Sequence, residues 1–202
     1  MSKKWYFTSE SVTEGHPDKL CDYISDTILD EALKQDKYSR VAIETFASAN
    51  QITIAGQLTT NATLDIEKIV RDRIKEIGYD RADLDIDYRT CKIDINITKQ
   101  SSDIAQGVDI GGAGVQGIMF GYASDETEEY MPFAISMAHK LAKRLTEVRK
   151  NGIIPYLRPD GKTQVTVEYE DGIVKRIDTI LISNQHEESA DMDILKKDIM
   201  EK

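Results

Sequence analysis

The sequence has little cysteine and no long run of apolar residues. Its two cysteines, Cys21 and Cys91, stand far apart and form no CxxC pair, so we expect both to be small apolar residues in a reducing compartment. No apolar run approaches the roughly 20 residues that a membrane-spanning helix needs. The first residues, MSKKWYFTSES, lack the apolar segment of a secretory signal peptide. These absences predict a cytoplasmic protein without a membrane partner.

The sequence also lacks a basic run. It holds 26 Lys and Arg against 36 Asp and Glu, which gives a formal net charge of -10, and such a surface should repel bare nucleic acid. Phosphates can bind to this chain only where Lys, His, a metal ion and backbone N–H groups gather locally. With 202 residues, 40% of them hydrophobic, the chain can form one or two domains with a core.

Hydrophobic periodicity predicts strand pairs that alternate with helices. Strands are expected at 4–11, 40–47, 51–60, 91–100, 118–123 and as a hairpin over 163–183. Helices are expected at 17–35, 65–80, 131–152 and in the tail from 189. The order lacks the regular rhythm of a parallel sheet, so the predicted fold class is α+β, with helices on one face of mixed or antiparallel sheets.

The segment EGHPDK, residues 14–19, opens the first predicted helix. Pro17 suits the first helical position, where its missing N–H costs nothing. Helix N-termini attract phosphate, Asp18 could hold Mg²⁺ against it, and His16 could donate a hydrogen bond to a leaving oxygen. A capped helix start with a surface histidine explains the same residues, so the pattern alone leaves both interpretations open.

Three other segments are ambiguous by themselves. LRPDGKTQV places Asp160 and Lys162 in a turn before a strand, which ordinary turn chemistry also explains. Glu44, in the middle of a strand, either faces solvent or meets a cation. GAGVQG, residues 112–117, matches G-x-G-x-x-G, but a loop precedes it and an apolar strand is predicted after it, so a glycine-rich hinge is the better interpretation.

Together these segments resemble the S-adenosylmethionine synthetase (methionine adenosyltransferase) family. The resemblance rests on FTSESVTEGHPDKL, AIET, DIEKIVRDRIKEIGYD, KQSSDIAQGVD, GIMFGYASDETEEYMP, TEVRKNG, YLRPDGKTQVTVEYEDG and SNQH, and it covers essentially the whole chain. It implies S-adenosylmethionine synthesis: the methionine sulfur attacks C5′ of ATP, and the expelled triphosphate is hydrolysed to phosphate and pyrophosphate. ATP and L-methionine are the expected substrates, with Mg²⁺ and K⁺ as cofactors.

The resemblance also implies a role for each site residue. His16 would act near the breaking C5′–O bond and Asp18 would bind Mg²⁺. Asp160 and Lys162 would contact ATP, with Lys162 taking part in catalysis. The resemblance further assigns Glu44 to K⁺ and Gln100 to methionine, at the start of a mobile loop.

Two positions depart from the family pattern on the methionine side. Gln57 stands where the family has a glutamate that meets the methionine ammonium, and an amide offers no charge to that group. Val115 stands where the family has an aspartate near the substrates. The expected site therefore differs from the family pattern on its methionine side, at Gln57 and Val115.

The family fold has three interleaved sub-domains in a chain roughly twice as long. We expect residues 1–13 with 119–202 to form the N-terminal sub-domain, 14–100 the central one, and 101–118 the mobile active-site loop and connection. The fold would be incomplete, so three hypotheses follow. The chain is one subunit of a split or heteromeric synthetase, a non-catalytic ATP-binding or regulatory paralogue, or a truncated product without function. Family members pair through flat sheets, so a homo- or hetero-oligomer is expected.

Overall fold

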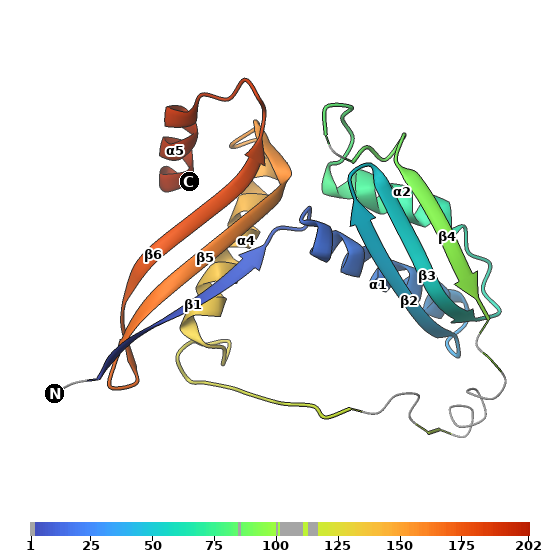
Figure 1. Ribbon diagram of the computed structural model, residues 1–202, viewed down its shortest axis with the longest axis horizontal. Coiled ribbons are helices and arrows are strands. Elements are labelled where there is room, and N and C mark those ends of the chain that lie inside the picture. The colour runs from blue at the N-terminus through green and yellow to red at the C-terminus, as the bar shows by residue number, and fades with distance from the viewer. Residues whose placement is uncertain (1–2, 85, 100, 102–110, 113–116) are drawn as a thin grey trace. The chain divides into compact units, whose positions relative to one another are not determined.

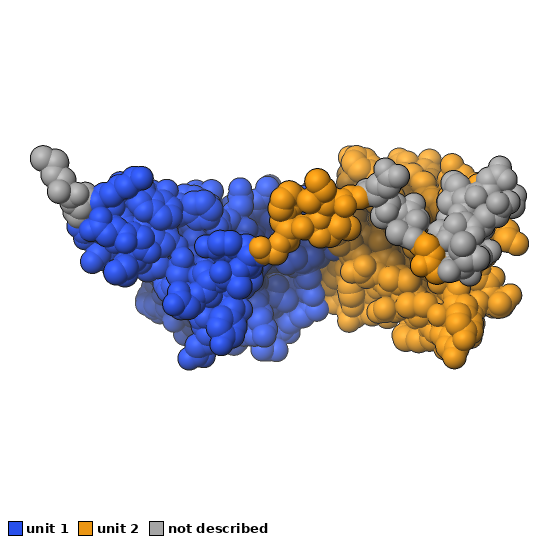
Figure 2. All heavy atoms as spheres, turned by 90° about the horizontal axis from the view of Figure 1, so that it is seen from below, with its two compact units in different colours: residues 1–19, 122–202 blue, residues 20–121 orange. Residues whose placement is uncertain are grey.

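The computed structural model describes residues 3–84, 86–99, 101, 111–112 and 117–202. The chain folds into two compact units (Figure 2). Unit 1 contains residues 1–19 and 122–202, and unit 2 contains residues 20–121. Each unit consists of a three-stranded sheet with helices, so the predicted α+β class is confirmed (Figure 1).

Unit 2 is built on a mixed sheet with strand order β2-β3-β4. β2 and β3 form an antiparallel hairpin, and β4 runs parallel to β3. Ile52 and Ile54 of β3 are fully buried together with Ile24 and Ile28 of the first helix and Ile74 of the second. The elements, in chain order, are α1 (Pro17–Gln35), β2 (Arg40–Ser48), β3 (Gln51–Thr59), α2 (Ile66–Ile77) and β4 (Lys92–Thr98).

The ends of these helices follow from their local sequence. α1 begins at Pro17 and ends at Gln35, as the sequence predicts. The Asp65 carboxylate caps α2 by accepting the Lys68 N–H at 3.0 Å. Gly78 ends α2 with φ at 110°, a left-handed conformation that costs glycine little. The helix starts and stops were therefore readable from the sequence.

Unit 1 is built on an antiparallel sheet with strand order β1-β5-β6. α4 covers one face, where Ala134 and Ala138 pack on Val165 and Val167. The predicted hairpin is confirmed, because Asp171 and Gly172 both adopt positive φ between β5 and β6. The elements are β1 (Lys4–Val12), α4 (Phe133–Lys150), β5 (Leu157–Glu170), β6 (Ile173–His186) and α5 (Met192–Glu201).

The strand predicted at 118–123 is wrong, because these residues have no regular secondary structure. Ile118, Met119 and Phe120 are 82%, 82% and 92% exposed. An apolar run becomes a strand only when another strand pairs with it, and in the described chain 118–123 pairs with none. The predicted mobile loop over 101–118 lies largely outside the described residues. No helix in the described ranges is long and apolar enough to span a membrane.

Candidate functional site

The segment EGHPDK and the segment RPDGK lie side by side in unit 1, although about 140 positions separate them in the sequence. The backbone N–H of Thr13 donates to the Gly161 carbonyl at 2.9 Å. The buried Thr13 hydroxyl donates to the Pro159 carbonyl at 2.7 Å. Val12, at the end of β1, pairs with Lys162 in β5. These contacts hold the start of α1 against the start of β5.

Two glycines allow this close approach. A Cβ atom at Gly15 would lie 2.4 Å from the carbonyl carbon of Pro159, and a Cβ at Gly161 would lie 2.3 Å from Oδ1 of Asn184. Real Cβ atoms essentially never come within 3.0 Å of such atoms. Any other residue at position 15 would therefore push the two segments apart, and any other residue at 161 would displace the Asn184 side chain.

His16 is held in one orientation at the start of α1. Its backbone N–H donates to the Thr13 carbonyl at 3.1 Å, and its Nδ1 accepts the backbone N–H of Asp18 at 3.2 Å. A ring nitrogen that accepts a hydrogen bond carries no proton, so in the neutral ring the proton is on Nε2. The side chain is 12% exposed. The Nε2–H of His16 is therefore the ring group that can donate a hydrogen bond to an acceptor on a bound ligand.

Asp18 presents its carboxylate to solvent beside this ring. The side chain is 91% exposed, and Oδ2 lies 3.8 Å from His16 Nδ1, which is too long for a hydrogen bond. Among the described residues no three His, Cys, Asp or Glu side chains gather to hold a metal ion. Mg²⁺ is commonly held by one or two carboxylates together with substrate phosphates, so a single exposed carboxylate fits an ion that arrives with phosphate.

The positive charges around the site come from several elements. Lys162 is exposed on the sheet face opposite α4, and the Lys19 ammonium donates to the Val12 carbonyl at 2.8 Å. Glu14, which the sequence analysis did not single out, accepts hydrogen bonds from Arg149 at 2.6 Å and from Lys150 at 3.0 Å. Glu14 and Arg149 lie 135 positions apart in the sequence, so no local pattern could predict that they pair.

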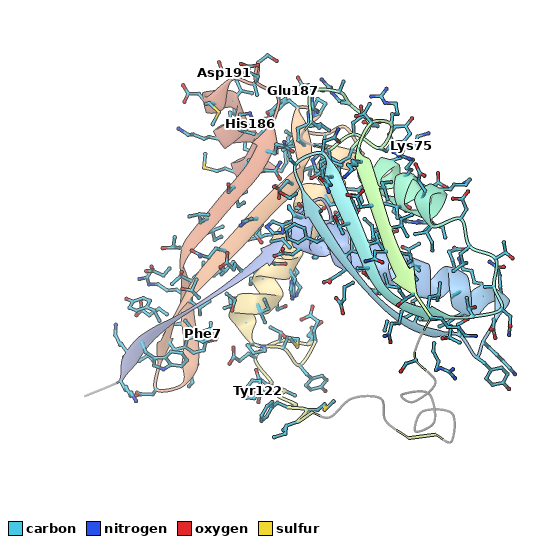
Figure 3. The ribbon with its side chains drawn as sticks, turned by 45° about the vertical axis from the view of Figure 1, so that its right-hand side comes forward. Phe7, Lys75, Tyr122, His186, Glu187 and Asp191 are labelled. Atoms are coloured by element: carbon cyan, nitrogen blue, oxygen red, sulfur yellow. The ribbon has the colours of Figure 1, made fainter. Side chains whose placement is uncertain are left out.

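The motif SNQH, at the end of β6, contacts the start of β5 through Asn184. The Asn184 side-chain amide donates to the Arg158 carbonyl at 3.1 Å. The buried Arg158 guanidinium, 8% exposed, forms an ion pair with Glu187. Figure 3 shows His186 and Glu187 at the end of β6, with Asp191 at the start of α5. Asn184 and Glu187 therefore hold Arg158, two residues before the half-buried Asp160.

Glu44 and Gln57 lie in unit 2, on the sheet face that α1 and α2 leave open. Glu44 is exposed and pairs with Ala55, two residues before Gln57, and Gln57 pairs with Ala42. This register places Glu44 and Gln57 on the same face as diagonal neighbours, which lie about 7–8 Å apart in an antiparallel pair. The Glu44 carboxylate offers oxygen ligands of the kind that hard cations prefer. Gln100 and Val115 lie outside the described residues.

Comparison with known proteins identifies the family. The family model "S-adenosylmethionine synthetase, N-terminal domain" matches residues 4–102, and "S-adenosylmethionine synthetase, central domain" matches residues 110–202. The chain belongs to the S-adenosylmethionine synthetase family. The family that the sequence motifs indicated is confirmed, and two of its domains account for nearly the whole chain.

Curated relatives named S-adenosylmethionine synthase align along almost all of this chain. The relative from Clostridium tetani is 55% identical over 209 residues, which cover 96% of this chain and 54% of the relative. The relative from Desulfosudis oleivorans is 55% identical, over 99% of this chain and 53% of its own length. The chain thus spans about half the length of the S-adenosylmethionine synthetases that it matches.

Proposed function

We propose that this chain forms S-adenosylmethionine from ATP and L-methionine, as one part of a synthetase whose other part is a second chain. The observation that carries the proposal is the close pairing of EGHPDK with RPDGK, made by the Thr13 hydrogen bonds and the contact of Gly15 with Pro159. Membership of the family supports the chemistry. The chain covers 54% of the length of the Clostridium tetani relative.

In the proposed reaction the methionine sulfur donates an electron pair to C5′ of ATP, and the C5′–O bond breaks. The triphosphate leaves with that electron pair and is then hydrolysed to phosphate and pyrophosphate. The Nε2–H of His16 would donate to the leaving oxygen. Lys162 and Asp160 would hold the nucleotide at the start of β5. Such fixed donors stabilise the charge that develops on the leaving group.

Mg²⁺ and K⁺ belong to the same proposal. Asp18 would hold Mg²⁺, which neutralises triphosphate charge when it is bound, and Glu44 would hold K⁺. Gln100 would contact methionine, as would Gln57 and Val115 in spite of their departure from the family residues. Residues 1–13 with 119–202, and residues 14–100, are proposed as the sub-domains that carry these groups.

A complementation assay tests the proposed function. The purified chain is mixed with ATP, L-methionine, Mg²⁺ and K⁺, alone and with the unmatched part of the Clostridium tetani relative as a separate chain. We expect S-adenosylmethionine from the mixture only. Full turnover by this chain alone would contradict the need for a partner, and no product in either case would count against the synthetase role.

A second candidate function is a non-catalytic ATP-binding or regulatory subunit that assembles with an active synthetase. The half-buried Gln57 favours it, because an uncharged amide replaces the family's acid on the open sheet face. We predict that Gln57→Glu combined with Val115→Asp leaves the activity of the complemented enzyme unchanged if this chain is catalytic as it stands. A clear rise in turnover would instead support the regulatory role.

A further inference from the structure

The motif TEVRKNG, residues 146–152, takes no part in the proposed reaction. It covers the end of α4, and two cations, Arg149 and Lys150, lie in the last turn of that helix. Both cations contact Glu14, the first residue of EGHPDK. TEVRKNG therefore touches the segment that carries His16.

The end of α4 is a fixed point in unit 1. Val148 is buried in an apolar cluster with Ile154 and Leu157. The Val148 carbonyl accepts the backbone N–H groups of Ile153 and Ile154 at 2.9 and 3.0 Å. Because Leu157 is the first residue of β5, the cluster that holds the end of α4 also holds the strand start that leads into RPDGK, residues 158–162.

Both carboxylate oxygens of Glu14 accept hydrogen bonds from this helix end. Oε1 accepts from the Arg149 guanidinium at 2.6 Å, and Oε2 accepts from the Lys150 ammonium at 3.0 Å. Hydrogen bonds between charged groups are roughly twice as strong as those between neutral groups. The Asp18 carboxylate, by contrast, is exposed. Glu14 is therefore suited to hold its own segment in place, and Asp18 is suited to meet a ligand.

The ion pair of Glu14 with Arg149 is partly withdrawn from water. The Arg149 side chain is 12% exposed and the Glu14 side chain is 27% exposed. Salt screens such a pair much less than a surface pair, and removal of one partner leaves a poorly hydrated charge behind. The pair of Arg144 with Glu147 on the same helix is 48% and 44% exposed, and such exposed pairs contribute little.

Glu14 belongs to the turn that places His16. The backbone N–H of His16 donates to the Thr13 carbonyl at 3.1 Å, which closes a four-residue turn with Glu14 and Gly15 at its centre. The Thr13 hydroxyl ties this turn to β5 through the Pro159 carbonyl, and the Glu14 carboxylate ties it to α4. A turn held at two points cannot pivot about either one.

We infer that Glu14 is a positioning residue for His16, which acts through its contacts with Arg149 and Lys150 of α4. The ion pair holds the turn, and the turn sets where the His16 ring lies. The Asp18 N–H then keeps the ring in the form with its proton on Nε2. The effect on catalysis rests on the proposed function, whereas the orientation of the ring does not.

NMR of the ring nitrogens in the purified chain tests the orientation of His16. The ¹⁵N chemical shifts distinguish a ring with its proton fixed on Nε2 from a mixture of the two neutral forms. At pH 8, where an ordinary histidine is neutral, wild type should show the fixed form. Glu14→Gln should show a mixture, because a looser turn no longer holds Nδ1 at the Asp18 N–H. His16→Gln identifies the signal among the three histidines.

Glu147→Gln is the matched control, since it breaks an exposed ion pair on the same helix, and it should keep the fixed form. Arg149→Gln removes the same partly buried pair from its other side and should give a mixture. A fixed ring in Glu14→Gln or in Arg149→Gln, or a mixture in wild type, would overturn the inference. A mixture in Glu147→Gln would show a general loosening of α4 and would also overturn it.

Kinetics of the complemented enzyme test the effect on catalysis. Glu14→Gln should lower kcat by about tenfold or more, because displacement of a catalytic group by about 1 Å can cost 10²-fold. The KM for ATP should change by less than about threefold. Arg149→Gln should have the same effect, and the double variant should be no slower than either single variant. Arg149→Lys, which keeps the charge, should recover most of the rate.

A rise in the KM for ATP with kcat unchanged would assign Glu14 to nucleotide binding and would overturn its positioning role. Multiplied losses in the double variant would show that Glu14 and Arg149 act separately, which also contradicts the inference. If the wild-type mixture forms no S-adenosylmethionine, the proposed function fails, and the ring measurement still decides whether Glu14 orients His16.

Discussion

Gly15 determines how closely the EGHPDK segment approaches Pro159. We predict that Gly15→Ala lowers the free energy of unfolding by about 1–3 kcal/mol, as overpacking of a tight contact does, because its Cβ would lie 2.4 Å from the Pro159 backbone. Urea unfolding measures the change. Gly121→Ala is the control, since a Cβ there meets nothing within 4 Å. Equal stability of Gly15→Ala and wild type would show that the two segments do not pack as described.

Glu168 makes unit 1 sensitive to acid. Its carboxylate lies 3.3 Å from the Lys4 ammonium and 2.8 Å from the Arg176 guanidinium, and the hydrogen bond from Lys4, with help from Arg176, holds the pKa of Glu168 below its usual 4.5. A lowered pKa stabilises the folded state above pH 4.5, and this stabilisation is lost as the pH falls through the lowered pKa.

Glu168→Gln should therefore be less stable than wild type at pH 7, and the difference should shrink between pH 5 and pH 3. The single tryptophan, Trp5, provides the probe, because its ring stacks on Tyr169 in the same sheet with centroids 4.2 Å apart. Glu128→Gln, at an exposed position of the same unit, is the control. A stability difference that stays constant from pH 7 to pH 3 would exclude Glu168 as an acid-sensitive contact.

Among the elements, α5 is held in unit 1 by hydrogen bonds and by apolar packing. Arg144 Nε donates to the carbonyl of Lys202, which caps the helix, at 2.9 Å, and Ile199 packs beside Leu195. The Tyr156 hydroxyl donates to the Asp198 carboxylate, and Leu195 of α5 is 5% exposed. The hydrogen bond to Asp198 raises the pKa of Tyr156 to about 12. The hydroxyl therefore stays protonated, and the bond keeps its full contribution below pH 10 and loses it as the pH rises through about 12.

We predict that Tyr156→Phe lowers the free energy of unfolding at pH 7 by about 1 kcal/mol, the usual worth of such a hydrogen bond. Amide hydrogen exchange in α5 should become faster, while exchange in β5 stays unchanged. Tyr38→Phe is the control, because the Tyr38 side chain is 77% exposed. Unchanged exchange in α5 would mean that the contacts of Arg144, Leu195 and Ile199 hold the helix without this hydrogen bond.

The sequence predicts those elements whose signals are local. Pro17 at the start of α1, Gly78 at the end of α2 and Asp171-Gly172 in the hairpin act within a few residues, and the structure confirms each. The apolar run at 118–123 has the right pattern for a strand, but pattern cannot supply a pairing partner. The contact of Thr13 with Pro159 joins distant segments, so it became visible only in the folded unit.

In the proposed function, the whole molecule combines residues proposed for ATP that match the family pattern with residues proposed for methionine that depart from it. In unit 1 the segment that carries His16 and Asp18 packs against the segment that carries Asp160 and Lys162, through hydrogen bonds of Thr13 and the pairing of Val12 with Lys162. Gln57, in unit 2, lacks the charge of the family's glutamate. His16 is therefore the residue proposed to assist cleavage of the C5′–O bond, and Gln57 is one of the residues proposed to meet methionine.

Rapid-quench measurement of C5′–O cleavage in the complemented enzyme tests this claim most directly. Enzyme with His16→Gln is compared with wild type at saturating ATP and methionine, and the appearance of the sulfonium product is followed in a single turnover. A general acid typically contributes about 10²–10⁴-fold to a rate. The account predicts that His16→Gln slows cleavage by at least about 100-fold, while hydrolysis of added tripolyphosphate changes little. An unchanged cleavage rate would contradict it.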